Sequence, residues 1–372
     1  MEIVLKNHEQ MLFALLRASL HEKEIDDVQP FLKAAPADWK LCYNLAAGQG
    51  VLALAWDSVS KVPEGAGPDR MLRLKWGLSV DGLETKYERY CRTIAELSTF
   101  YAERGIVTMQ MKGVGFSTHY PIPAHREGGD IDIFTYSADS QKMTDKEANR
   151  LADTLMQQQG IEVDTDHSPK HSNFYYKGIP IENHKTFLNV ELYEVANQVE
   201  NLLKKVMDPR PTELLSGKYT ILTPSPAFNT LFLAFHAAQH YGSGLALHHL
   251  CDWAMLITRH GVQLPDALTD KRFREGIAAF TCLCNSLLGT SVPVEGGEDL
   301  AKEILGETLY PPFDSKGTPV QGKVGVFIYK TKRFLHRSKI SNRILYKPLW
   351  KRTWDSIVIH IRRPDTIFQT NP

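Results

Sequence analysis

The stretch Arg126-Glu127-Gly128-Gly129-Asp130-Ile131-Asp132-Ile133-Phe134 places a glycine turn directly before two aspartates that are separated by one apolar residue. In a β-strand, successive side chains point to opposite faces, so Asp130 and Asp132 share one face while Ile131 and Ile133 occupy the other. Neighbouring carboxylates repel each other unless a cation lies between them, and hard divalent ions such as Mg²⁺ prefer oxygen ligands. The stretch therefore predicts a strand with one apolar face and one metal-binding face.

A second glycine turn lies upstream, at the end of a short β-favouring run. Ile106 to Met111 forms that run, and Lys112-Gly113-Val114-Gly115 follows it, which favours a turn or the start of a helix. Downstream, Thr144 and Glu147 have the spacing of a capping box, so we predict a helix that ends at Gly160.

A third acid lies on a predicted hairpin further along the chain. His171 to Tyr176 and Ile179 to His184 flank Lys177-Gly178, a pair that is typical of a tight turn between two strands. Apolar and polar residues alternate in the second strand, which places Glu182 on its polar face. We therefore expect Glu182 to join the two aspartates.

Helical patterns dominate the chain on both sides of this segment. Leu83 to Arg104 is a long amphipathic run closed by Gly105, and Ser225-Pro226 opens an apolar-periodic helix that continues to Tyr241. We predict an α+β fold in which a mixed-sheet core is flanked by helical regions. Its expected parts are a helical N-terminal region (1–104), the α/β core (105–208), a helical C-terminal region (209–322) and a basic C-terminal segment (323–372).

The charge of the chain is balanced overall but unevenly distributed. The 43 basic and 43 acidic residues cancel, yet from Lys323 onward there are 12 Lys and Arg against two acidic residues. This segment carries a net charge of +10 and the preceding chain one of −10. Pairing of the basic segment with acidic parts of the same protein is our first interpretation. Binding to nucleic acid is the less favoured alternative.

The sequence predicts a cytoplasmic protein that does not insert into a membrane. Its five cysteines are odd in number and scattered through helical segments, which fits a reducing compartment better than a disulfide framework. Its N-terminus has helical apolar spacing and early charges instead of the pattern of a signal peptide.

Taken together, the motifs resemble those of the uncharacterised bacterial nucleotidyltransferase family within the polymerase-β-like superfamily. The residues that carry the resemblance are Lys112-Gly113, Tyr120-Pro121, Arg126, Gly129-Asp130-Ile131-Asp132-Ile133 and Gly178 to His184. The resemblance covers roughly residues 8 to 300 and implies a nucleotidyltransferase-like core. In this superfamily a glycine turn, an acidic-x-acidic strand and a carboxylate on a neighbouring strand form the catalytic centre.

The resemblance implies that Asp130, Asp132 and Glu182 are the catalytic residues and the ligands of Mg²⁺ or Mn²⁺. Nucleotidyl transfer uses one ion at the acceptor hydroxyl and one at the departing pyrophosphate, and three carboxylates suit such a pair. Glycine permits close backbone contact with phosphates, Lys112 and Arg126 neutralise their charge, and His184 shares the face of Glu182. The expected nucleotide-binding residues are Lys112, Gly113, Gly115, Arg126 (as a two-pronged donor), Gly129 and His184.

The expected reaction is metal-dependent transfer of a nucleoside monophosphate from a nucleoside triphosphate such as ATP, with release of pyrophosphate. The acceptor is unknown and is a small molecule, a saccharide or a protein. The superfamily turn usually reads Gly-Gly or Gly-Ser, whereas this chain has Lys112-Gly113. That departure motivates an alternative, a nucleotide-sensing or partner-binding module on a degenerate core. A nucleic-acid-associated protein is the second alternative.

Several residues keep other interpretations open. An Asp-x-Asp pair can simply cap a turn, a lone lysine is usually solvated, and Glu191 and Glu194 compete with Glu182 as the third acid. His236 and His240 are four apart and share a helix face, as do His248 and Asp252. Interior histidines without a ligand are the commoner outcome, and a place in the substrate pocket or a zinc site is the alternative.

Overall fold

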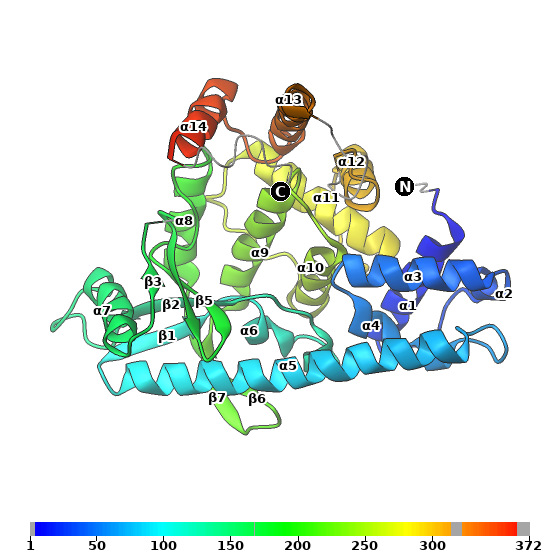
Figure 1. The fold of residues 1–372 in the computed structure, drawn as a ribbon, viewed down its shortest axis with the longest axis horizontal. Helices are drawn as coiled ribbons and strands as arrows, with labels where there is room; N and C mark the ends of the chain where they lie inside the picture. The colour runs from blue at the N-terminus through cyan, green and yellow to red at the C-terminus, as the bar shows by residue number, and fades with distance from the viewer. Residues whose placement is uncertain (1–3, 167, 314–321, 363–372) are drawn as a thin grey trace.

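The computed structural model describes residues 4–166, 168–313 and 322–362, so residues 363–372 of the predicted basic segment lie outside the described range. The elements follow one another in three groups along the chain (Figure 1). The first group is helical and comprises α1 (Asn7–Leu20), α2 (Gln29–Leu32), α3 (Pro36–Gly48), α4 (Leu52–Trp56), η1 (Val59–Lys61) and α5 (Arg70–Ala102).

Helix α5 is 33 residues long and, in the view of Figure 1, lies beneath strands β1, β2 and β5 and the N-terminal helices. Within a region expected to be helical, the sequence predicted the amphipathic run from Leu83 to Arg104. The helix starts earlier because the Asp69 carboxylate accepts a hydrogen bond from the Leu72 N–H and caps the first turn. Gly77 continues the helix where an added Cβ would lie 3.4 Å from the Trp56 ring. Packing against the N-terminal helices thus outweighs the low helix propensity of glycine.

The second group builds a seven-stranded mixed sheet with the strand order β3-β4-β5-β2-β1-β7-β6. Strand β2 lies at its centre, antiparallel to β1 and parallel to β5. The elements are β1 (Ile106–Gln110), α6 (Val114–Ser117), η2 (Pro123–His125), β2 (Ile131–Ser137), α7 (Asp145–Gln158), β3 (Val163–Asp164), β4 (His171–Tyr176), β5 (Ile179–His184), α8 (Ala196–Val206), β6 (Arg210–Leu214) and β7 (Tyr219–Thr223). The mixed sheet with its flanking helices confirms the predicted α+β class.

The local predictions for the centre of the sheet are confirmed. Lys177 and Gly178 both have positive φ, 51° and 73°, and turn β4 into β5 as a two-residue hairpin. The Thr144 hydroxyl accepts from the Glu147 N–H while the Glu147 carboxylate accepts from the Thr144 N–H, which is the capping box that starts α7.

The end of the predicted core at residue 208 needs correction, because the sheet continues to Thr223. Strands β6 and β7 form an antiparallel pair, and β7 adds to the free edge of β1. Strand β6 is mostly exposed and contains Pro211, which suits an edge strand. Its side chains lack the apolar alternation that would have marked it in the sequence.

The two faces of the sheet have different surroundings. Ile131, Ile133 and Ile181 point into an apolar core shared with α5 and α7. On the opposite face, Phe134 of β2 contacts Phe187, which in turn contacts Phe228 of α9. This opposite face carries Asp132 and is covered by the C-terminal helices.

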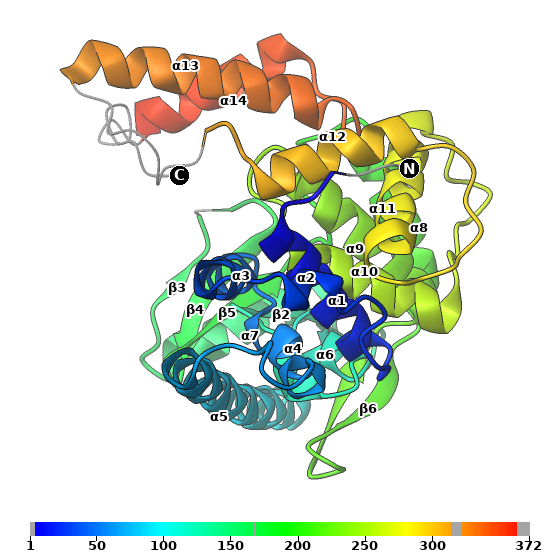
Figure 2. The ribbon, with the colours of Figure 1, turned by 90° about the vertical axis from the view of Figure 1, so that its right-hand side faces the viewer.

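The third group is helical: α9 (Pro226–His240), α10 (Leu247–His260), α11 (Lys271–Leu287), α12 (Glu298–Leu309), α13 (Gly322–Ser341) and α14 (Leu349–Arg362). Helices α13 and α14 of the basic segment lie together on one side of the molecule, next to α12 (Figures 1 and 2). Two residues of this segment pair with acids of α12: His336 of α13 with Glu307, and Arg343, which follows α13, with Glu303. Within the described residues, no helix combines the length and apolar character needed to cross a bilayer.

Candidate active site

Asp132 and Glu182 lie side by side on the central strands. They are Cα partners in the parallel pairing of β2 with β5, so both carboxylates project from the same face of the sheet. His184 follows two residues later on that face, and ligand atoms of the three side chains lie within 4.8 Å of one another. The competing acids Glu191 and Glu194 are exposed and lie outside the sheet.

The hydrogen bonds at this cluster leave room for a cation. Asp132 is fully buried, and its Oδ2 atom has no hydrogen-bond partner among the described residues. His184 Nδ1 lies 3.2 Å from the Thr186 carbonyl oxygen, while its Nε2 lies 3.1 Å from Asp132 Oδ1 and 3.4 Å from Glu182 Oε2. With no cation present, His184 Nε2–H donates to Asp132; with a cation between them, donation from Nδ1 to the Thr186 carbonyl would leave an Nε2 lone pair for the ion, which is the usual orientation of a metal-binding histidine. The residues therefore fit a divalent cation.

Lys112 supplies a positive charge to the same cluster. Its Nζ lies 3.2 Å from Asp132 Oδ1 and 3.1 Å from His236 Nε2. Burial alone would raise the pKa of Asp132, but the Lys112 ammonium and the hydrogen bond from His184 hold this pKa well below its ordinary value. Burial opposes the charge of Lys112 too, yet the charges of Asp132, Asp130 and Glu182 raise the lysine pKa above its usual value. Both partners are therefore charged at neutral pH.

Asp130 lies just before β2 and borders the cluster without joining its closest set of ligand atoms. It lines a groove of about 760 Å³ together with Glu182, Asn173 and Tyr175. Burial, followed by the negative charge of Asp132, raises the pKa of Asp130. A further positive charge near the groove would therefore favour ionised Asp130.

The predicted role of Arg126 needs correction. Its Nη2 lies 2.6 Å from Asp252 Oδ2 and its Nε lies 3.1 Å from Asp252 Oδ1, so the two-pronged donation goes to a carboxylate of α10. The Tyr120 hydroxyl donates to the same carboxylate. Burial makes this pairing necessary, since an unpaired guanidinium at this place would be costly. Asp252 thus orients Arg126.

The glycine-rich stretch before β2 is fixed by three different elements. The Glu127 carboxylate accepts hydrogen bonds from the N–H groups of Leu52 and Ala53 and so caps α4. From α5, the Tyr90 hydroxyl donates to the Gly129 carbonyl and Lys86 donates to the Gly128 carbonyl. Together with the Arg126–Asp252 pair, these contacts set the position from which β2 starts.

Backbone conformation and close packing explain why glycine occupies two positions of the first turn. Gly113 has φ 63°, which favours glycine, and an added Cβ would lie 3.4 Å from the Asp130 carbonyl oxygen. At Gly115, an added Cβ would lie 2.7 Å from Gln110 Cγ and 3.0 Å from the Gln110 carbonyl oxygen. The turn therefore packs tightly against the end of β1 and the start of β2.

Two groups near the acids were missed or left open by the sequence. Lys170 precedes β4, and burial lowers its pKa although the nearby charges of Glu182 and Asp132 act in the opposite direction. His236, His240 and His249 bring their ring nitrogens within 4.8 Å of one another beside Lys112. Burial first, and the Lys112 charge next, lower the pKa values of His236 and His240, so these rings are neutral at neutral pH. The i, i+4 spacing indicated the first two, but nothing in the sequence indicated His249.

The central acidic pair on a mixed sheet, with helices on both sides, defines this chain as a protein with a nucleotidyltransferase-like fold. Residues 35–289 match a family described as uncharacterised nucleotidyltransferases. The chain belongs to this family, which confirms the resemblance noted in the sequence. Comparisons with curated proteins and with solved structures found no match.

Proposed function

We propose that this protein transfers a nucleoside monophosphate from a nucleoside triphosphate to a hydroxyl or phosphate of an acceptor, with release of pyrophosphate and dependence on Mg²⁺ or Mn²⁺. One observation carries the proposal: Asp132, Glu182 and His184 bring ligand atoms within 4.8 Å of one another, and the buried Oδ2 atom of Asp132 has no partner among the described residues. Carboxylate oxygens suit Mg²⁺, and a set that includes an imidazole also suits Mn²⁺. A bound ion of this kind polarises phosphoryl oxygens and activates an acceptor hydroxyl.

The remaining roles follow from charge and position. Lys112 adds a cation at the inner edge of the acids, where it neutralises part of the charge of the phosphates. Asp130 lines the groove next to Glu182 and adds a second carboxylate on the open side of the cluster. Tyr175 lines the same groove with 69% of its surface exposed, and its ring offers a face on which a nucleobase can stack.

Binding of Mn²⁺ tests the metal site directly. We expect calorimetric titration to detect Mn²⁺ binding in the wild type and at least tenfold weaker binding in Asp132→Asn and Glu182→Gln. Glu191→Gln is the matched control, because this exposed glutamate lies outside the sheet and should leave Mn²⁺ binding unchanged. Equal affinity in wild type and Asp132→Asn would refute the assignment.

Label transfer tests the reaction. Nucleoside triphosphates labelled at the α-phosphate are incubated with the protein and a cell lysate, and we expect the label to move to an acceptor in the wild type but not in Asp132→Asn. Binding of the nucleotide without transfer to any acceptor would instead support the nucleotide-sensing module, for which the unusual Lys112-Gly113 turn is the motivation.

A further inference from the structure

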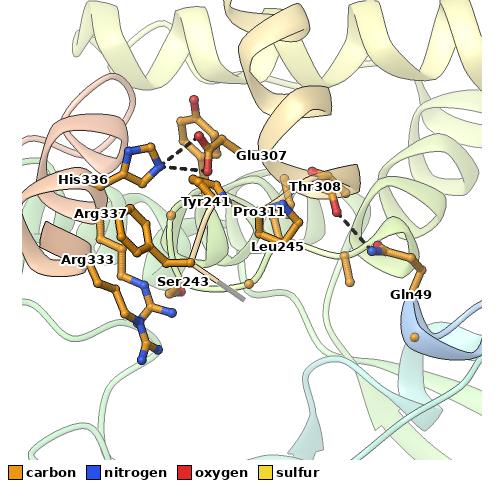
Figure 3. A pocket seen from close by; sticks show the side chains of 16 residues that line it. Gln49, Tyr241, Ser243, Leu245, Glu307, Thr308, Pro311, Arg333, His336 and Arg337 are labelled. Carbon is orange, nitrogen blue, oxygen red and sulfur yellow. Dashed lines mark hydrogen bonds and ion pairs between the residues drawn. The ribbon is translucent and has the colours of Figure 1, made fainter. Parts of the chain in front are cut away.

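A second cavity, of about 290 Å³, lies apart from the acids, between the loop that connects α9 to α10, the end of α12 and the inner face of α13. Figure 3 shows the side chains that line it. Gly242 in the loop has φ 90°, and an added Cβ there would lie 2.9 Å from Ile340 Cγ1 of α13. Helix α13 is therefore closely packed on the loop and forms a fixed wall of the cavity.

This wall carries two arginines that have no acidic partner within the part of the chain that the structure describes. Arg333 and Arg337 are four residues apart on α13, and their guanidinium groups lie near each other beside Ser243 (Figure 3). The Arg333 side chain is only 8% exposed, and its Nε atom has no hydrogen-bond partner in residues 4–166, 168–313 and 322–362. Among the described residues, no carboxylate forms an ion pair with either arginine. The acid that lines the cavity, Glu307, is already bonded to His336 Nε2 at 3.0 and 3.1 Å.

Two like charges in one enclosed space are unfavourable without a counter-charge. Burial and the neighbouring charge of Arg333 lower the pKa of Arg337 to about 10, so the Arg337 guanidinium still carries its charge at neutral pH. A guanidinium presents a planar fork of N–H donors that matches the oxygens of a phosphate. The cavity thus has the charge, the donors and the size to enclose one phosphate group and a small body attached to it.

We propose that this cavity binds the phosphate group of a phosphorylated small molecule other than the nucleoside triphosphate, with Arg333 and Arg337 as its ligands. Helix α9 connects this site with the acids: His236 contacts Lys112, and Tyr241, five residues later, lines the cavity. Five helical residues span about 8 Å, which a small phosphorylated molecule can bridge. If the proposed reaction is correct, the bound molecule is the acceptor. Both arginines lie outside residues 35–289, so the family match assigns them no role.

Calorimetric titration of the full chain with inorganic phosphate, glycerol 3-phosphate and glucose 6-phosphate tests this site, with glycerol and glucose as uncharged counterparts. We expect at least one phosphomonoester to bind the wild type, with binding at least tenfold weaker in Arg333→Gln and Arg337→Gln. Arg333→Lys keeps the charge but loses the planar fork of donors, so its affinity for the phosphomonoester should lie between those of the wild type and Arg333→Gln. Arg343→Gln is the matched control, because Arg343 follows α13, pairs with Glu303 and does not line the cavity.

Thermal unfolding gives an independent readout. Phosphate should raise the melting temperature of the wild type and of Arg343→Gln, and should have no such effect on Arg337→Gln. Mn²⁺ binding to the acids should be unchanged in Arg337→Gln, so failure of the phosphate site and failure of the proposed reaction are distinguishable. The proposal is overturned if no phosphorylated probe binds, if the arginine variants bind as well as the wild type, or if ATP or single-stranded RNA displaces the probe through the same two arginines.

Discussion

Replacement of Lys112 by methionine should destabilise the protein because Asp132 would remain buried without its main counter-charge. The two groups are 3.2 Å apart, and at an effective dielectric constant of about 20 their attraction is on the order of 5 kcal/mol. Lys112 retains some exposure, and His184 still contacts Asp132, so part of this energy is retained in the variant. We expect a loss of about 3 kcal/mol in the free energy of unfolding at pH 7.5, at the lower end of values for broken buried pairs.

The loss should depend on pH with a defined sign. In the wild type, the folded-state pKa of Asp132 lies below its unfolded value, so its contribution to stability is complete above the unfolded pKa of about 3.9 and is lost only at lower pH. In Lys112→Met, burial without the ammonium raises the folded-state pKa. The variant is then least stable at neutral pH relative to the wild type, and the difference shrinks as pH falls toward 5.

Urea unfolding at pH 7.5 and pH 5.0, with and without Mn²⁺, measures both effects. Mn²⁺ should stabilise Lys112→Met more than the wild type, because the ammonium no longer competes for Asp132. Lys142→Met is the control, since it breaks an exposed pair with Asp139 and should change little at either pH. The reasoning would be refuted if the free energies of unfolding of Lys112→Met and the wild type differed by less than about 1 kcal/mol, or by the same amount at both pH values.

Three further variants test the contacts around the acidic strand. Arg126→Met leaves a buried carboxylate unpaired and should cost about 3 to 5 kcal/mol in thermal unfolding, whereas Arg104→Met, at an exposed pair, should stay near wild type. Gly115→Ala introduces a Cβ 2.7 Å from a neighbouring carbon and should cost about 1 to 3 kcal/mol in urea unfolding, whereas Gly129→Ala, with no atom within 4 Å of the added Cβ, should be neutral. Glu127→Ala removes the cap of α4 and should cost about 1 kcal/mol; an unchanged urea midpoint would argue against the capping role.

The sequence was most informative where the structure is local or strictly periodic. Because the turn at Lys177-Gly178 has two residues, the cross-strand pairs of the hairpin follow by counting outward from it. Asn173 is thereby paired with Glu182, and His171 with His184. The same counting would have placed Lys170 on the opposite face, and this lysine comes near the acids because it lies just outside the strand. The alternation around Asp132 likewise fixed which face is polar. These features are determined by residues that are close together in the sequence.

Contacts between distant segments could not be read from the sequence. Arg126 and Asp252 are 126 residues apart, and neither has a local pattern that indicates the other. Edge strand β6 has mostly exposed side chains, so apolar alternation gave no signal for it. The first half of α5 contains Gly77 and Gly82, which disfavour a helix unless its neighbours pack against it. In each case tertiary packing decides the local structure.

The Lys112–Asp132 contact bears on how the protein matures in a cell. A nascent chain that had to enclose a bare aspartate would need to capture its ion before the sheet could close. Because the compensating ammonium is encoded in the same polypeptide, closure of the sheet around Asp132 requires no bound cation. A divalent ion that binds as we propose would then bind reversibly to a fold that is already complete.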